Sequence, residues 1–140
     1  MNAVTTPSRF DELEAAVASM PPREFDTFHH FSPGLYGREI RIPAGSMLTG
    51  RTHSGKCLNI VCGDISVANE EDGSVRRIVG HEVFESQPGT RRLGMTHAPT
   101  IWTCIHANPT NETDPEKLMA MFTVPHVNPL LDGGRQHPLK

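Results

Sequence analysis

The chain has 140 residues, of which 36% are hydrophobic and 21% are charged. This is the size of one domain with one core, and the composition is typical of a globular protein. A formal net charge of −3 indicates no general affinity for nucleic acid or for an anionic membrane. Apolar runs are short and no basic segment precedes one at the N-terminus, so we expect no membrane span, no signal peptide and a cytoplasmic location.

Turn-forming residues and cysteines narrow the fold class. The 12 glycines and 12 prolines favour short strands joined by turns over long helices. Cys57, Cys62 and Cys104 are an odd number of cysteines without zinc-type spacing. We therefore expect reduced thiols in a strand-rich core, with a disulfide as the less favoured alternative.

The N-terminal segment predicts a short amphipathic helix. Ser8 and Asp11 have the spacing of a capping box, and the proline pair at 21–22 would end the helix. The apolar residues that follow the cap at helical spacing are Phe10, Leu13, Val17 and Met20.

Residues 23–37 are rich in aromatic side chains but are interrupted by Pro33 and Gly34. This pattern predicts an extended arm with little regular structure, of a kind that often wraps a neighbouring subunit. His29 and His30 lie within it. Adjacent residues of an extended chain face opposite ways, so an interface role is favoured over shared binding of one ion.

From residue 38 onward, brief β-type runs alternate with turn residues. The eight predicted strands cover residues 38–42, 47–52, 57–62, 65–69, 75–79, 82–86, 91–96 and 100–107. Eight strands at this spacing can close into a jelly roll. The predicted fold is all-β with minor α, with a barrel over 38–108, a helix and arm over 1–37, and a second helix and irregular tail over 109–140.

The second helix is predicted from Thr113, a candidate N-cap, with Glu116 three residues later. It would run to about Phe122 and pack against the outside of the barrel. Beyond Pro125 the sequence has no periodicity, which predicts an irregular tail.

The candidate site lies in residues 42–63, IPAGSMLTGRTHSGKCLNIVCG. Residues two apart in a strand share a face, so Arg51 and His53 point the same way. On the predicted partner strand, Cys57 and Asn59 share a face in the same manner. Together these faces would line the mouth of the barrel.

This segment resembles the first metal-ligand motif of the cupins, in which a glycine and five residues precede His-x-His, a glutamate and a turn glycine. Gly45 starts the pattern, Arg51 stands at the first histidine, His53 at the second, Cys57 at the glutamate, and Gly63 closes the hairpin. The resemblance implies a cupin-type jelly-roll barrel of the RmlC-like superfamily. No metal cofactor is favoured, because a guanidinium places positive charge where the cation would sit.

The second cupin motif would fall on residues 87–92, where arginine again stands near the histidine place. Arginines that converge on one cavity would bind a carboxylate, phosphate or nucleotide in a bidentate manner. The predicted ligand-binding residues are Arg51, His53, Asn59, Arg91, Arg92 and His97.

Two alternatives stay open. In the first, the arginines form surface salt bridges with Asp64, Glu82 or Glu85. In the second, a divalent transition metal is bound, and its candidate ligands are His53, Cys57, His97 and His106. His106 shares a predicted strand face with Trp102 and Cys104, which favours a packed core histidine.

Three blocks, HHFSPGLYGREIRIPAG, LTGRTHSGKCLNIVCGDISV and PGTRRLGMTHAPTIWTCIHANPTNETDPEKL, resemble a family of small uncharacterised cupin-like proteins encoded by tailed bacteriophages and prophages. The resemblance covers residues 28–118 and implies a phage context. The family hairpin often reads G-K-x-H-x-x-E-H-x-N. Here Lys56 and Cys57 replace its acidic residue and second histidine, which further disfavours a metal.

We therefore predict a non-catalytic binding protein that forms a homodimer or larger assembly. It would sequester a small anionic molecule, such as a nucleotide signal of host defence, or contact a host or virion protein. The alternative is a metal-dependent cupin enzyme of isomerase or dioxygenase type, centred on His53. The Ser-His-Asp, phosphate-loop and HExxH patterns are absent from the sequence, so no catalytic residue is predicted.

Overall fold

Three long antiparallel strands form the frame of the protein. The computed structural model describes residues 8–20 and 25–124, so the tail predicted after Pro125 lies outside the described residues. The elements are α1 (Arg9–Ala18), β1 (Asp26–Ser32), β2 (Gly34–Ile42), β3 (Met47–Thr49), β4 (Thr52–His53), β5 (Cys57–Asn69), β6 (Val75–Ser86), β7 (Arg92–Asn108), α2 (Pro115–Phe122) and β8 (Thr123–Val124).

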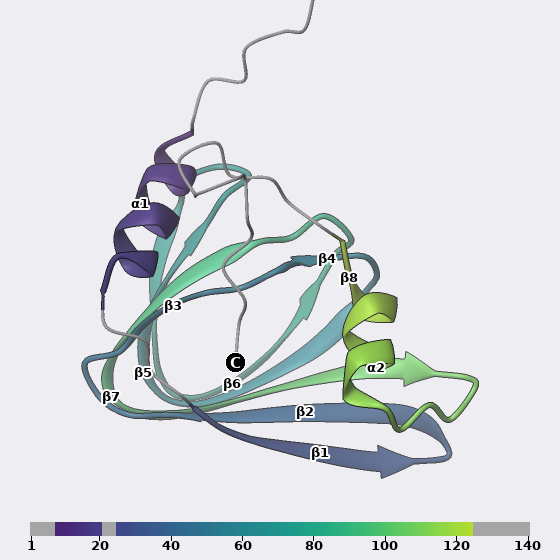
Figure 1. Ribbon diagram of the computed structural model, residues 1–140. Helices are drawn as coiled ribbons and strands as arrows, with labels where there is room; N and C mark the ends of the chain where they lie inside the picture. The colour runs from purple at the N-terminus through teal and green to yellow at the C-terminus, as the bar shows by residue number, and fades with distance from the viewer. Residues whose placement is uncertain (1–7, 21–24, 125–140) are drawn as a thin grey trace, which may run out of the picture.

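The strands form one curled sheet and one short ribbon. The sheet has the order β1-β2-β7-β5-β6, with β3 paired to β7 beside this path, and β4 pairs with β8. Figure 1 shows the sheet wrapping around an interior, with α1 at one side and α2 near the opposite end. The predicted strand-rich fold with two flanking helices is confirmed. No helix within the described residues is long and apolar enough to cross a bilayer.

The predicted eight short strands are wrong in one respect. The turns expected at Gly63, Gly80 and Ala98 are bends inside β5, β6 and β7, which continue through them. The β5–β7 register shifts between Cys62 and Ile65. A bulge of this kind bends a strand without ending its pairing. Each of the three long strands therefore runs through both halves of the barrel.

Gly63 makes this bend possible. Its φ is +150°, and a Cβ placed there would lie 2.4 Å from Thr100 Oγ1 and 2.6 Å from Thr100 Cα. The backbone N–H of Asp64 donates to the same Thr100 hydroxyl at 3.1 Å. Two strands therefore touch at the corner, with space for a hydrogen atom alone at position 63.

The predicted irregular arm is also wrong. Within residues 23–37, the described part forms β1 and the start of β2, which pair from Asp26 to Arg41. Pro33 and Gly34 form the two-residue turn of this hairpin, with Gly34 at φ +76°. Proline followed by a glycine of positive φ suits a type II turn, so this dipeptide joins two strands where the sequence suggested a break.

The two histidines of β1 face opposite sides, as predicted. His29 Nδ1 lies 2.6 Å from the Tyr36 hydroxyl. His30 Nε2 lies 2.9 Å from Glu39 Oε1 on the other face. Each ring has its own partner within the hairpin, and the interface role stays a prediction.

Helix α1 begins as predicted and covers the outside of the sheet. Asp11 N–H donates to Ser8 Oγ at 3.0 Å, and Ser8 N–H donates to Asp11 Oδ2 at 3.1 Å, which completes the capping box. Phe10 and Val17 pack with Leu93 of β7 in a hydrophobic cluster. A separate cluster, inside the barrel, contains Val61, Ile65, Val67 and Ile78.

Helix α2 differs from its prediction in start and position. Its N-cap is Asp114, whose side chain accepts from Glu116 N–H at 3.0 Å. Thr113 donates its own N–H to the Glu112 carboxylate, which places the cap one residue later. The Phe122 ring stacks on His106 at a centroid distance of 4.3 Å. The end of the helix therefore packs on His106, a buried side chain of β7, whereas packing on the outside of the barrel was predicted.

We expect Gly63→Ala to destabilise the protein by about 3 kcal/mol, since the new methyl group would force two paired strands apart. Urea unfolding measures this cost. Gly80→Ala is the matched control, because Gly80 has φ +87° but open space around its Cβ position. It should lose only about 1–2 kcal/mol from backbone strain, and equal losses in the two variants would contradict the steric explanation.

Candidate functional site

A cavity of about 70 Å³ lies inside the barrel. Its apolar wall is formed by Ile40, Ile42, Leu48, Ile65, Val67 and Trp102. Its charged and polar side chains are Arg38, Arg51, His53, Asn59, Thr90, Arg92 and Cys104. Four of the six predicted ligand-binding residues, Arg51, His53, Asn59 and Arg92, thus meet at one cavity.

The route by which Arg51 and His53 reach the cavity differs from the single strand predicted over 47–52. β3 ends at Thr49 and β4 begins at Thr52. The break at Gly50 is held by its N–H, which donates to Arg92 O at 2.8 Å. His53 is anchored in turn by its N–H, which donates to Thr90 O at 3.0 Å. Thr90 and the start of β7 therefore hold the backbone on either side of Arg51 and Thr52.

On β5 the predicted alternation is confirmed. Cys57 and Asn59 are buried, whereas Leu58 between them is 48% exposed. Asn59 is fully buried, and its Oδ1 accepts from Trp102 Nε1 at 3.0 Å and from Cys104 Sγ at 3.2 Å. Asn59 therefore ties two side chains of β7 to β5 at the cavity.

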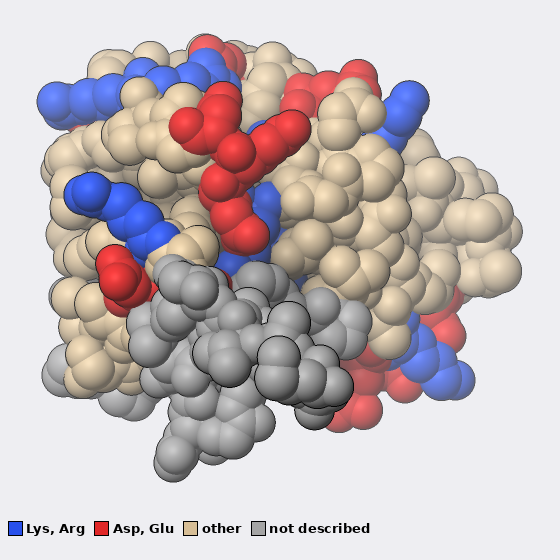
Figure 2. Space-filling view, turned by 90° about the horizontal axis from the view of Figure 1, so that it is seen from above, with Lys and Arg blue, Asp and Glu red and all other residues tan. Residues whose placement is uncertain are grey.

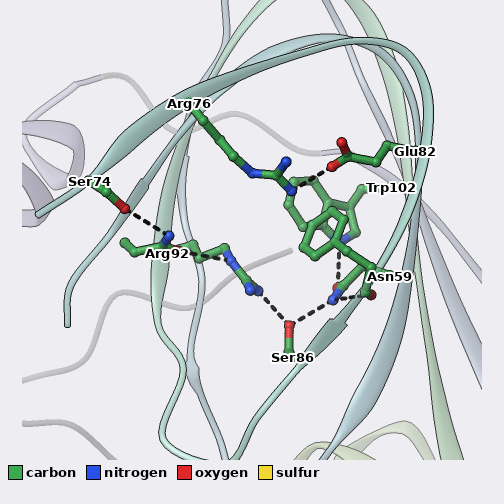
Figure 3. Close-up of polar contacts among 9 residues, drawn as sticks. Asn59, Ser74, Arg76, Glu82, Ser86, Arg92 and Trp102 are labelled. Atoms are coloured by element: carbon green, nitrogen blue, oxygen red, sulfur yellow. Dashed lines mark hydrogen bonds and ion pairs between the residues drawn. The ribbon is translucent and has the colours of Figure 1, made fainter. Parts of the chain in front are cut away.

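Arg92 is held in the cavity by neutral partners. Figure 3 shows its guanidinium and the Asn59 amide converging on Ser86 Oγ. Arg92 Nη1 donates to this oxygen at 2.6 Å and Asn59 Nδ2 donates at 2.7 Å. Arg92 Nε donates to Asn69 Oδ1 at 3.1 Å. These hydrogen bonds orient the guanidinium without neutralising its charge.

Arg51 and Arg92 bring positive charge to the cavity. Among the described residues, no carboxylate forms an ion pair with Arg51 or Arg92, and Arg51 Nε is buried without a hydrogen-bond partner. Burial lowers the pKa of Arg92 and of Arg38, and Arg38 is also near Arg51. On the face seen in Figure 2, by contrast, acidic and basic side chains are intermixed.

The surface salt bridges considered for these arginines are formed by other residues. Asp64 pairs with Arg77, and Glu82 pairs with Arg76. Arg51 and Arg92 are thus left facing the cavity.

A thiol and an imidazole meet at one end of the cavity. Cys57 Sγ lies 3.3 Å from His53 Nδ1. A hydrogen bond with Cys104, aided by His53, lowers the pKa of Cys57 to about 4. The same bond, together with burial, raises the pKa of Cys104. Of the two neighbouring thiols, Cys57 therefore ionises first.

Three potential metal ligands converge beside this pair. Cys57 Sγ, Cys104 Sγ and a ring nitrogen of His106 all lie within 4.8 Å of one another. His106 is buried, as predicted for a core histidine, and burial lowers its pKa. Cys104 was missed as a site residue, although it shares the predicted face of His106, because its approach to Cys57 depends on the pairing of β5 with β7.

His97 does not reach the cavity. It is exposed, and its Nε2 lies 2.6 Å from Ser66 Oγ. It lies on β7 an odd number of residues from Arg92 and from Cys104, so strand alternation points it away from the cavity. His97 therefore does not line the cavity, where it was predicted to bind the anion or, in the alternative, a metal.

Arg91 also lies away from the cavity, because it points to the opposite side of the strand from Arg92. Its side chain is buried under α1, where it pairs with Glu14 and, at 2.8 Å, with Glu70 Oε2. Asp11 Oδ1 lies 3.5 Å from Arg91 Nη1. This buried ion cluster fastens α1 to the sheet and is structural.

Comparisons with known proteins support the architecture. Neither a protein-family model nor a curated protein sequence matches the chain. Among solved structures, salicylate 1,2-dioxygenase from Pseudaminobacter salicylatoxidans is 12% identical, with a TM-score of 0.55 over 70% of this chain and 29% of its own. Protein NMB1881 from Neisseria meningitidis is 11% identical, with a TM-score of 0.52 over 66% of this chain and 93% of its own. KdgF from Halomonas sp. is 13% identical, with a TM-score of 0.50 over 67% of this chain and 91% of its own.

The chain has a cupin-type jelly-roll fold. Identities of 11% to 13% show the fold alone. The chain spans 29% of the dioxygenase, so the activity named for that protein does not transfer with the architecture. The cupin-type barrel that the resemblance of residues 42–63 implied is nevertheless confirmed.

We expect Arg91→Ala to destabilise the protein by about 3–5 kcal/mol, because it leaves buried carboxylates without their cation. Arg91 is 2% exposed and Glu14 is fully buried. Chemical denaturation measures the loss. Arg77→Ala, which breaks the exposed pair with Asp64, should stay close to wild type; a similar loss in both would contradict the structural role of Arg91.

Proposed function

We propose that the protein binds a small anionic group, a carboxylate or a phosphate, inside the barrel between Arg51 and Arg92. The observation that carries this proposal is the buried Arg51 Nε, which has no hydrogen-bond partner among the described residues. Arg92 faces the same cavity. An anion could accept a hydrogen bond from Arg51 Nε and could neutralise the charge of Arg92, whose hydrogen-bond partners are neutral.

The energetics favour an anion over water alone. A cation withdrawn from bulk water loses solvation, and a paired anion in the same low-dielectric space restores much of that loss. Guanidinium groups offer two parallel N–H donors to a carboxylate or phosphate, which adds directional hydrogen bonds to the charge attraction. The Arg92 guanidinium is already held by Ser86, and the backbone next to Arg51 is held by the Gly50 N–H, which reduces the ordering needed on binding.

The size of the cavity restricts the ligand. At about 70 Å³, it is smaller than the cavity of ~150 Å³ that admits benzene in an engineered protein. A single carboxylate or phosphate group fits this space. A nucleotide, the signal suggested by the phage resemblance, would insert only its phosphate end, and the base would lie outside.

Sequestration of such a ligand in a phage-infected cell is the biological role we propose, since the hairpin and strand blocks resemble phage-encoded cupin-like proteins. A metal-dependent enzyme is the second candidate. The observation that favours it is the group of Cys57, Cys104 and His106 beside His53. One of the structural neighbours is itself a dioxygenase.

The binding proposal predicts a selective effect of Arg51→Gln. Inorganic phosphate, acetate and a nucleoside monophosphate should be titrated into the wild type and followed by thermal shift and calorimetry, because a ligand that binds only the folded state raises its melting temperature. Loss of a charge-assisted hydrogen bond should weaken the bound anion by about 10- to 100-fold.

Arg41→Gln is the matched control, since Arg41 is exposed and pairs with Glu39 on the hairpin. It should leave the affinity unchanged. Arg92→Gln should weaken binding as Arg51→Gln does. Wild-type affinity in both cavity variants, or no anion binding by the wild type, would exclude the proposed site.

A further inference from the structure

The three sulfur and nitrogen donors described above come from two strands that are rigidly paired. Asn59 is directly opposite Cys104, and Leu58 is opposite Ile105, which brings Cys57 beside His106. The sheet thus sets the donors close together before any ligand is present. Two of the three lie on β7, outside both stretches where the cupin motifs fall in this chain.

Their spacing suits one metal ion. Zinc in proteins lies about 2.3 Å from sulfur and about 2.0–2.1 Å from imidazole nitrogen, so tetrahedral ligand atoms are about 3.4–3.8 Å apart. The donors of Cys57, Cys104 and His106 lie within 4.8 Å of one another. His53 lies outside this group of three, but its Nδ1 is 3.3 Å from Cys57 Sγ, which makes it the candidate for a fourth ligand.

We propose that Cys57, Cys104, His106 and His53 form a sulfur-rich site for a soft transition-metal ion, with zinc as the principal candidate. Thiol and imidazole ligands favour zinc or copper(I) over magnesium, calcium or manganese, which prefer oxygen ligands. This inference rests on the second candidate function in one respect, the presence of a metal ion in the barrel. It does not require that the protein be an enzyme.

Charge explains how a cation is tolerated beside arginines. A histidine-only site would add a dication to a cavity that already contains Arg51 and Arg92. Two coordinated thiolates carry two negative charges and cancel those of a zinc ion. The sulfur ligands therefore remove the electrostatic objection that the arginine at the first histidine position raises.

Cobalt(II) titration of the reduced, full-length protein tests the site, because thiolate-bound cobalt has a near-ultraviolet charge-transfer band and zinc displaces it. We expect one cobalt per chain and loss of the band, with at least 100-fold weaker binding, in Cys57→Ser and in Cys104→Ser. His106→Gln should weaken binding as well. Cys62→Ser is the matched control, since Cys62 lies on the exposed face of the same strand as Cys57, and it should bind as the wild type does.

Thiol protection supplies a test that does not depend on the folding of a variant. With zinc present, alkylation of the wild type should label Cys62 and spare Cys57 and Cys104; without zinc all three should become labelled on prolonged exposure. Absence of a cobalt–sulfur band in the wild type, wild-type affinity for cobalt in Cys57→Ser and Cys104→Ser, or thiol labelling that does not change with zinc would overturn the proposal. Anion affinity is measured separately on chelator-treated protein, so failure of the metal site and failure of the anion site give different results.

Discussion

Thr100 fills the space that a side chain at position 63 would need, and this contact between β5 and β7 sets the geometry of the whole molecule. Because residue 63 is glycine, both strands bend without losing their partners. One half of each strand then pairs beneath α1, while the other half extends towards α2 (Figure 1). The inner face of both halves encloses the cavity, so the site exists only because the corner closes.

The alternation of side chains assigns opposite roles to two neighbouring arginines. Arg91 points outward to Glu14 of α1 and to Glu70, where its charge is paired. Arg92 points inward to Ser86 and Asn69, which orient it and leave its charge uncancelled. The same residue type is therefore a structural anchor at one position and a candidate ligand donor at the next, and only the parity of the strand separates the two.

Sequence spacing was sufficient to predict the barrel, because turn glycines and short apolar runs are local features. The same residues could not distinguish a bend from a turn: glycine permits both, and only contacts such as Gly63 with Thr100 decide which occurs. His97 was misplaced for a different reason: it is an odd number of residues from both Arg92 and Cys104, so the alternation of the continuous strand β7 puts it on the opposite face. Arg51 and His53 were placed at the cavity by their position in the motif. The link of Asn59 to Cys104 and Trp102 required a register between β5 and β7 that no local pattern encodes.

The cavity combines two kinds of group, cationic arginines and a pair of thiols of which one, Cys57, is acidic. Each kind of group opposes binding of the ligand that the other attracts. The arginines repel a metal ion, and an ionised Cys57 repels an anion. With a dication on two thiolates the sulfur end becomes neutral, and the arginine charges are then free to attract an anion into the remaining space. An anion in contact with both the metal and Arg51 would strengthen metal binding by the same factor by which the metal strengthens anion binding, because linkage is reciprocal. The two proposed ligands are for this reason expected to cooperate in one cavity.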